Sequence, residues 1–307
     1  MSKQIGIYTA FVLCWSSGFI GAKLGTGTAD AVTLLLWRFV PLAAVLGAVA
    51  ALRRRRPARS VVARQAAVGL LSQCGYLLTV YWAIGLGVSS GTTALIDGTQ
   101  PLVVGALAGP LLRQRVTARQ WAGLCTGLAG VALVTAADAG ASSGVPGWAY
   151  AVPFAGMLAL VAATFVEQRS PVAVEPLDAL TVQCAASAVA LSAIAVAGGA
   201  VVPPADGTFW LAVGWLIVFA TFGGYGLYWV ALRRNGVTTV NALMFLMAPT
   251  TAVWGALMFG EPLGPVTVAG LLVALAAVVV VIRPANGGRD LIIGRDRRTA
   301  PRCMSCR

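Results

Sequence analysis

The amino-acid sequence predicts an all-α integral membrane protein with ten transmembrane helices arranged as a 5+5 inverted repeat. Three observations predict this fold: an apolar composition, ten long apolar stretches, and a similarity between the two halves of the chain. Of the 307 residues, 58% are hydrophobic and only 10% are charged. A soluble domain carries about 25% charged residues, so this chain lacks the polar surface that a water-soluble fold needs.

The ten apolar stretches occupy most of the chain. A bilayer core of about 30 Å needs about 20 apolar residues in a helix. The expected spans are 5–23, 31–51, 66–86, 88–112, 120–137, 148–167, 177–198, 208–231, 236–258 and 264–282. The first span resembles a signal peptide because Lys3 precedes it, but nine spans follow, so we expect it to remain as a helix.

The basic residues predict the orientation, because cytoplasmic loops are rich in lysine and arginine. Apart from Lys23 and Arg38, these residues lie near the N-terminus, in the tail from residue 283, and in four loops: 53–64, 113–119, 168–176 and 232–235. We therefore expect a multi-pass protein of the bacterial inner membrane with both termini in the cytoplasm. The net charge of +12 is then mainly a signal of topology, and no nucleic-acid partner is expected.

The two halves of the chain resemble each other. Residues 93–101 align with 241–249, and 121–124 align with 268–271, at an offset of about 148 residues. We expect a first five-helix repeat over 1–145, a second over 146–283, and a short basic cytoplasmic tail over 284–307. Because five is odd, the second repeat enters the membrane from the opposite side, which is an architecture of secondary transporters.

Several short motifs resemble the EamA-like branch of the drug/metabolite transporter superfamily. They are Cys14-Trp15-Ser16-Ser17-Gly18-Phe19 with Lys23, Trp37-Arg38-Phe39, the helices at Pro101 and Pro249, Gly260-Glu261-Pro262-Leu263, and Gly270. The resemblance covers nearly the whole chain. It implies an exporter of small organic metabolites, such as amino acids or drugs, that works by alternating access. Gln114 departs from the family pattern, which has a glutamate there, so a symmetric pair of carboxylates with Glu261 is not expected.

Enzymatic chemistry has little support in the sequence. The absence of histidine removes His-dependent catalytic triads and His-containing zinc sites. Residues 87–91 match the GxSxG nucleophile elbow in letters, but they join two membrane spans and lack a histidine base, so we interpret them as a tight turn. Cys303 and Cys306 form a single CxxC, which is not expected to bind a metal. We expect no catalytic residue, cofactor or metal.

Two charges within the spans mark the expected substrate site. Arg38 and Asp97 lie on spans that run in the same direction, at depths of roughly 10 and 13 Å, so they can pair or share a substrate. Asp97 also shares a polar helix face with Ser90, Thr93 and Gln100. The alternatives are a purely structural ion pair, or a polar face that only packs against another helix. The candidate substrate-binding residues are Trp15, Ser17, Arg38, Tyr76, Thr93, Asp97, Gln100 and Asn241, with Thr221 as a further polar candidate.

Other expectations concern the membrane edge and the assembly. Lys23 lies near the outer end of its span and is expected to snorkel to the interface. The motifs Gly105-x-x-x-Gly109 and Gly123-x-x-x-Gly127 predict close helix packing within the bundle, and they leave a homodimer open. The expected partners are therefore a small-molecule substrate and the lipid bilayer.

Two other classes of function stay open at this point. A membrane-embedded enzyme would need a catalytic constellation, and a non-transporting membrane sensor would need a soluble output domain. The sequence shows neither feature.

Overall fold

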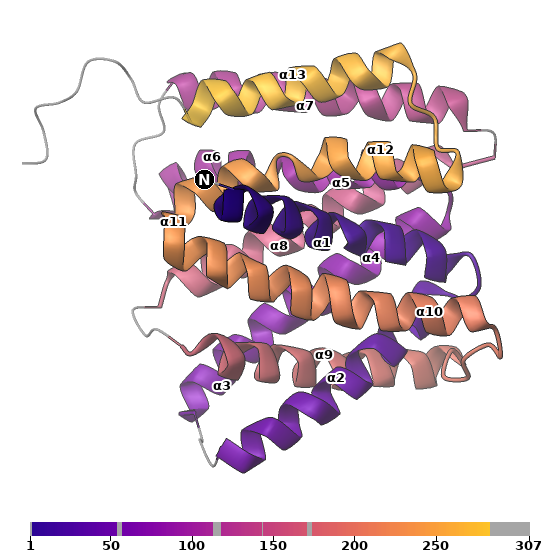
Figure 1. Cartoon of the computed structure of the whole chain (residues 1–307), viewed down its shortest axis with the longest axis vertical. Coiled ribbons are helices and arrows are strands. Elements are labelled where there is room, and N and C mark those ends of the chain that lie inside the picture. Colours follow the sequence, from indigo (N-terminus) through magenta and orange to yellow (C-terminus); the bar gives the residue numbers. More distant parts are fainter. Residues whose placement is uncertain (1, 54–56, 113–117, 143, 171–173, 283–307) are drawn as a thin grey trace, which may run out of the picture.

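A computed structural model describes residues 2–53, 57–112, 118–142, 144–170 and 174–282, and the regular structure in these ranges is helical (Figure 1). The helices are α1 (Ser2–Thr26), α2 (Ala31–Arg53), α3 (Arg59–Gly69), α4 (Tyr76–Gly85), α5 (Ser90–Gly98), α6 (Gln100–Leu112), α7 (Ala118–Ala141), α8 (Val152–Gln168), α9 (Pro176–Gly198), α10 (Gly207–Trp215), α11 (Gly226–Met244), α12 (Met247–Phe259) and α13 (Pro265–Ile282).

The helices form a multi-pass membrane protein. Within the described ranges, seven helical runs are long and apolar enough to cross a membrane, and α12 and part of α13 are shorter apolar helices. Most helices run in roughly the same direction across the molecule (Figure 1). Large apolar side chains lie on the outside, including Leu257, which is 81% exposed, and Val189, which is 72% exposed. Such a surface is suited to lipid rather than to water.

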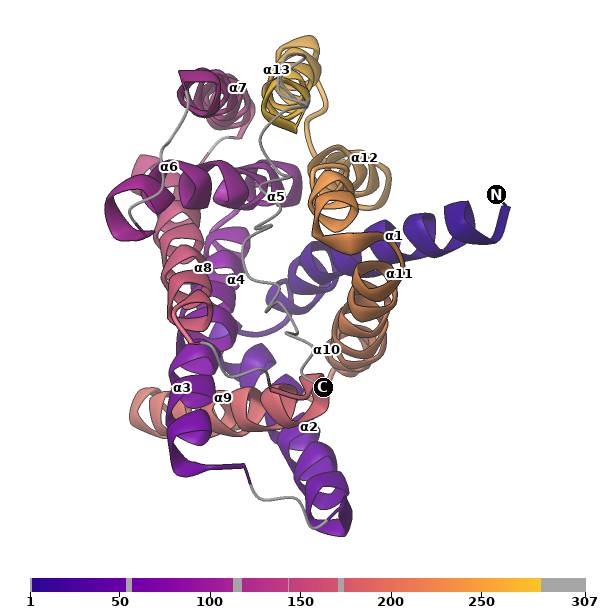
Figure 2. The same cartoon turned by 90° about the vertical axis from the view of Figure 1, so that its left-hand side faces the viewer.

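Helices from the two halves of the chain pack against each other in pairs. Helix α7 lies along α13, α2 along α9, α5 along α12, and α4 along α8. Figure 2 shows α7 beside α13 at one end of the molecule, with α2 and α9 at the other. The halves therefore interlock, and a space enclosed by the bundle is lined by both of them.

The backbones of α7 and α13 pack closely against each other. A Cβ atom added to Gly130 would lie 2.7 Å from the carbonyl oxygen of Gly270, so only glycine fits at this position without moving a helix. Close packing was expected at Gly105 and Gly109 and at Gly123 and Gly127. A Cβ on Gly105, however, would meet nothing within 4 Å, so the expectation for that glycine was wrong.

Helix geometry is interrupted at corresponding positions in the two halves. Leu70–Gly75, between α3 and α4, and Leu216–Tyr225, between α10 and α11, are π-helical. A break at Thr99 separates α5 from α6, and a turn at residues 245–246 separates α11 from α12. Non-α geometry within membrane helices is common at functional sites, because it redirects side chains and frees backbone groups. All four interruptions lie beside the cavity described below.

The expected boundaries need two corrections. The loop expected at 232–235 is helical, because α11 continues through Arg233 and Arg234 to Met244; both arginines are good helix formers and no proline interrupts them. The third helical run begins at Arg59 rather than at residue 66. Gln114 and the tail from residue 283, with Cys303 and Cys306, lie outside the described residues.

Candidate functional site

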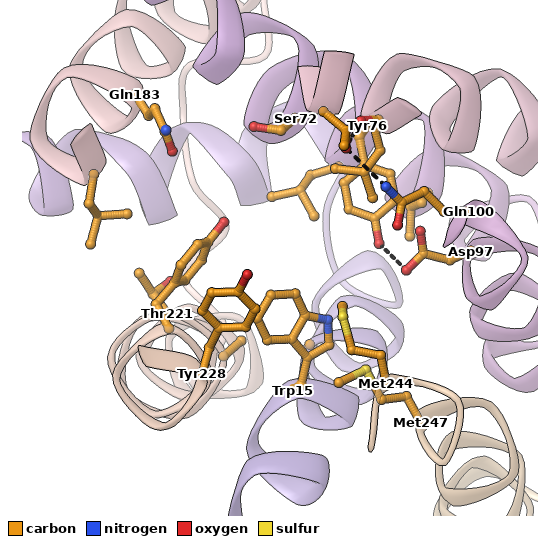
Figure 3. A pocket seen from close by; sticks show the side chains of 18 of the residues that line it. Trp15, Ser72, Tyr76, Asp97, Gln100, Gln183, Thr221, Tyr228, Met244 and Met247 are labelled. Atoms are coloured by element: carbon orange, nitrogen blue, oxygen red, sulfur yellow. Dashed lines mark hydrogen bonds between the residues drawn. The ribbon is translucent and has the colours of Figure 1, made fainter. Parts of the chain in front are cut away.

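A cavity of about 1040 Å³ lies within the bundle and is lined by residues of both halves of the chain. This is about the upper limit of the volume of ordinary small-molecule pockets. The cavity extends to Gln168 at the end of α8 and to Pro176 at the start of α9. Its polar and aromatic lining residues are Trp15, Phe19, Arg38, Ser72, Tyr76, Tyr81, Asp97, Gln100, Thr164, Gln168, Gln183, Thr221, Phe222, Tyr225, Tyr228 and Trp229, several of which are shown in Figure 3.

Asp97 lies in the last turn of α5, just before the break at Thr99. The Tyr76 hydroxyl donates a hydrogen bond of 2.8 Å to Asp97 Oδ2, while Oδ1 is buried and has no hydrogen-bond partner. The C-terminal end of a helix dipole disfavours negative charge. The negative charge of Asp97 therefore does not stabilise α5. The carboxylate lines the cavity, and its Oδ1 can still accept a hydrogen bond.

Arg38 lies on α2 and is only 4% exposed. Its Nη1 donates to the Tyr81 hydroxyl and its Nη2 donates to Thr221 Oγ1 at 3.0 Å, while the buried Nε has no partner. The guanidinium also lies 5.2 Å from the centre of the Phe39 ring. Among the described residues, no carboxylate pairs with Arg38, so neutral groups hold a buried positive charge beside the cavity.

Arg38 and Asp97, which the sequence allowed either to pair or to share a substrate, do not form an ion pair in the described structure. Each charge instead contacts a tyrosine of α4: Tyr81 binds Arg38, and Tyr76 binds Asp97. Both charged residues nevertheless line the same cavity. Their depth along the membrane normal could be predicted from the sequence, but the rotation of each helix could not, so the sequence did not decide whether the two charges pair.

Aromatic side chains form the wall between the two charged regions. The Trp15 ring centre lies 5.6 Å from that of Tyr225 and 6.0 Å from that of Tyr228. Met244 and Met247 also line the cavity, and Figure 3 shows both close to Trp15. This wall is large and apolar, with phenol hydroxyls at its edge, so it suits an apolar or aromatic group of a ligand.

The remaining candidate residues divide into three groups. Gln100, at the start of α6, lines the cavity and donates to Thr164 Oγ1 at 3.0 Å. Ser17 and Thr93 are not among the lining residues, because their hydroxyls donate to the backbone carbonyls of Cys14 and Ser89 on the preceding turn. The side chain of Asn241 lies outside the described residues.

Sequence reasoning missed four polar lining residues: Ser72, Thr164, Gln168 and Gln183. Gln183 is a polar residue in the middle of an apolar span, and the reasoning that identified Asp97 could have found it. Ser72 lies in the π-helical segment Leu70–Gly75, whose side-chain directions a period of 3.6 residues does not predict.

A second polar cluster lies at the N-terminus of α5, at the opposite end from Asp97. Glu261 accepts hydrogen bonds from Ser90 N at 2.9 and 3.0 Å and from Ser90 Oγ at 2.6 Å, and Lys23 Nζ lies 3.4 Å from Glu261 Oε1. We call Lys23, Ser90 and Glu261 the α5 clamp. The expectation that Lys23 snorkels was wrong, since a buried carboxylate lies within its reach.

Local backbone geometry explains the α5 clamp and the turn beside it. Gly260 ends α12 in the left-handed conformation, with φ 66°, and so directs Glu261 back toward α5. Ser89 caps α5 by accepting a hydrogen bond from Thr92 N, and Gly87 has φ 105°, which glycine adopts readily. The GxSxG sequence therefore forms a turn, as expected, and its Ser89 also caps α5.

Comparison with known families decides the class of the protein. Residues 4–136 and 147–283 each match the model of the EamA-like transporter family. The chain belongs to this family. The expectations of an EamA-like resemblance and of a transporter that is not an enzyme are thereby confirmed for this EamA-like transporter.

Two individual proteins resemble this EamA-like transporter over most of its length. A "probable terminal-alkyne amino-acid exporter" of Streptantibioticus cattleyicolor is 26% identical over 301 residues, which cover 94% of this chain and 96% of the relative. A chain in a solved crystal structure aligns with a TM-score of 0.57 at 20% identity, over 92% of this chain and 96% of that chain. The second match supports the fold alone.

Proposed function

We propose that this transporter exports small organic metabolites, with amino acids as the first class to test, across the bacterial inner membrane by alternating access. The cavity shared by the two halves, with a carboxylate and a guanidinium on its walls, carries this proposal. The amino-acid exporter that resembles nearly the whole chain supports the substrate class and the direction. In this proposal the first repeat covers 1–145, the second 146–283, and the tail 284–307.

The proposed transport cycle starts from a conformation in which the cavity extends to one end of the helix bundle and the α5 clamp lies at the other end. The cavity extends toward Gln168 and Pro176, and its lining includes no residue of the α5 clamp at the other end of α5. With the arginine-rich loops in the cytoplasm, the cavity is open toward the cytoplasm and the α5 clamp closes the external side. Opening the α5 clamp while the cytoplasmic side closes would release the substrate outside.

The topology on which this direction depends can be tested with reporter fusions. Fusions at Gly144 and Asp206, which precede the sixth and eighth of the ten proposed spans, are expected to report a periplasmic location. Fusions after Arg169 and at the C-terminus are expected to report the cytoplasm. Cytoplasmic signals at either Gly144 or Asp206 would contradict the ten-span inverted repeat.

Transport by the purified full chain tests the proposed function. Proteoliposomes loaded with a mixture of amino acids, amino-acid analogues and hydrophobic amines are expected to release a subset of the amino acids faster than protein-free liposomes. Mass spectrometry of the external medium identifies the released compounds. Release of amines or other metabolites alone would contradict the amino-acid class. Absence of any protein-dependent release would leave the membrane-sensor alternative in its place.

A further inference from the structure

We propose that the break between α5 and α6 binds a sodium ion, held by the carboxylate of Asp97, the side-chain oxygen of Gln100 and backbone carbonyls at the end of α5. This inference goes beyond the proposed function, because it assigns an inorganic cation to the edge of the cavity. It does not depend on which organic substrate the protein carries. Three observations support it: acceptor atoms without donors, a single negative charge, and the negative end of a helix dipole.

Asp97 supplies an acceptor atom that no described donor uses. The Tyr76 hydroxyl donates to Oδ2 at 2.8 Å, whereas Oδ1 is buried and has no hydrogen-bond partner. A buried carboxylate oxygen without a partner is costly, and so is a buried charge without a counter-charge. A bound cation removes both costs together, which a neutral hydrogen-bond donor does not.

The orientation of the Gln100 amide adds a second oxygen. Its Nε2 donates to Thr164 Oγ1 at 3.0 Å, and that hydroxyl donates in turn to the carbonyl oxygen of Leu160 at 2.9 Å. Because the Thr164 hydrogen is used in this way, Thr164 can only accept from Gln100, so the amide oxygen Oε1 points away from Thr164. In Figure 3 the side chains of Asp97 and Gln100 extend toward the same region of the cavity. This region therefore has two acceptors, and among the described residues no donor lies between them.

The helix break leaves backbone carbonyls without their usual donors at the same place. Pro101 has no N–H, so it cannot donate to the carbonyl of Asp97, four residues earlier. Leu102 N donates to Thr99 O at 2.9 Å, so the carbonyl of Gly98 also lacks the donor that a continuous helix would give it. Both carbonyls lie at the negative end of the α5 dipole, which favours a cation. Carbonyls at the C-terminal ends of half-helices are a means by which membrane transporters bind Na⁺.

The charge and the ligand atoms of the site select a monovalent hard cation. Asp97 is the only acid among the described lining residues of the cavity, and the other oxygens at the break are neutral. One carboxylate balances Na⁺, whereas Ca²⁺ or Mg²⁺ would keep an uncompensated positive charge in a buried site. Carboxylate, amide and carbonyl oxygens suit such ions better than zinc or copper. Arg38 donates to Tyr81 and Thr221 instead of to Asp97, so no described side chain supplies the missing positive charge.

Binding of radioactive sodium to the purified full chain tests this site without any organic substrate. The measurement is a scintillation proximity assay at constant ionic strength, with choline as the replacement cation. We expect the wild type to bind sodium saturably, with one ion per chain. Unlabelled Na⁺ should displace the label, and K⁺ should need a concentration about tenfold higher, because a carboxylate attracts the smaller ion more strongly.

Variants then assign the site to its ligands. Asp97→Asn removes the negative charge and should weaken sodium binding by about tenfold or more, whereas Gln100→Leu removes one neutral oxygen and should weaken it by about two- to tenfold. Gln100→Glu adds a second carboxylate and should make Ca²⁺ an effective competitor, a gain that a misfolded protein would not show. The matched controls are Asp178→Asn on α9 and Gln4→Leu at the exposed start of α1, which should bind sodium like the wild type.

The outcomes separate the sodium site from its alternatives and from the proposed function. Absence of saturable sodium binding by the wild type, or equal binding by Asp97→Asn, would overturn the site. Displacement by K⁺ at the same concentration as by Na⁺ would overturn the assignment to sodium. If acid pH, but not sodium, raises the unfolding temperature of the wild type and not that of Asp97→Asn, a proton occupies Oδ1 and the assignment is wrong. Release of amino acids from proteoliposomes is a separate measurement, so the proposed function stands or fails independently of sodium binding.

Discussion

Asp97→Asn and Arg38→Ala are each expected to reduce transport by about 10- to 100-fold while the protein still reaches the membrane. A hydrogen bond that involves a charged group contributes about 1.5–3 kcal/mol, and each 1.4 kcal/mol corresponds to a tenfold change in affinity. Both side chains line the cavity, and neither is needed to neutralise the other in the described structure. The measurement is initial efflux from proteoliposomes that contain equal amounts of each variant.

Arg53→Ala and Asp178→Asn are suitable controls for this comparison. Arg53 pairs with Glu175 at 3.2 Å on an exposed surface, where side chains are 45% and 38% exposed, and such a pair contributes little to stability. Asp178 lies in the first turn of α9 and is not among the cavity-lining residues. Wild-type flux in both cavity variants, at normal expression, would show that Arg38 and Asp97 have structural roles and that substrates bind elsewhere.

A proton-coupled cycle would place an additional demand on Asp97. Among the described residues that line the cavity, it is the only carboxylate, so it is the available group for carrying a proton with each transport cycle. If a pH gradient drives wild-type efflux, the residual efflux of Asp97→Asn is expected to be independent of that gradient. Gradient-dependent efflux in this variant would place the coupling proton on another group.

Much of the fold could be predicted because a membrane imposes its own length scale on a helix. Apolar run lengths located most helix ends within a few residues; the span expected at 177–198 is α9, Pro176–Gly198. The region after residue 207 was harder, because two arginines in a continuing helix resemble a loop when only charge is considered. The π-helical segments Leu70–Gly75 and Leu216–Tyr225 could not be predicted, because they satisfy tertiary packing rather than a local preference.

The candidate site was also partly predictable, because the membrane restricts which residues a helix can carry. Charges inside a membrane are costly, so Asp97 and Arg38 could be identified from the sequence alone, and both line the cavity. Serine and threonine residues are weaker predictors of a binding site. The hydroxyls of Ser17 and Thr93, for example, donate to backbone carbonyls within their own helices and do not line the cavity. The partner of Lys23 could not be predicted either, since Glu261 is 238 residues away and meets it only through the packing of α12 on α1.

The α5 clamp is the second place where a large effect is expected. Helix α5 has nine residues, with Ser90 held by Glu261 at one end and Asp97 facing the cavity near the other. A short helix moves as a rigid unit, so a change at its N-terminus is transmitted to the position of Asp97. The space for the α5 clamp depends on Gly255, because a Cβ atom there would overlap Glu261 and Ser90.

Glu261→Gln is expected to shift the conformational equilibrium about 10- to 100-fold toward the state that is open on the external side, because a charge-assisted contact of about 1.5–3 kcal/mol is lost from the closed side. The Glu261 side chain is 8% exposed, so solvent compensates little of this loss. A cysteine placed at Ala94, one turn from Asp97 on the cavity wall, should then react faster with a membrane-impermeant maleimide added outside whole cells. The same variant without that cysteine gives the background labelling.

Three further variants distinguish opening of the α5 clamp from general damage to the fold. Lys23→Met combined with Glu261→Gln removes both charges, so it should disturb the equilibrium less than Lys23→Met alone, which leaves the Glu261 carboxylate without its ammonium partner. Glu175→Gln removes a carboxylate from the exposed pair with Arg53, away from the α5 clamp, and should leave labelling at position 94 unchanged. If Glu261→Gln labels at the wild-type rate while its transport is normal, the α5 clamp holds α5 in place without closing the external side, and the proposed closure must be sought among other residues.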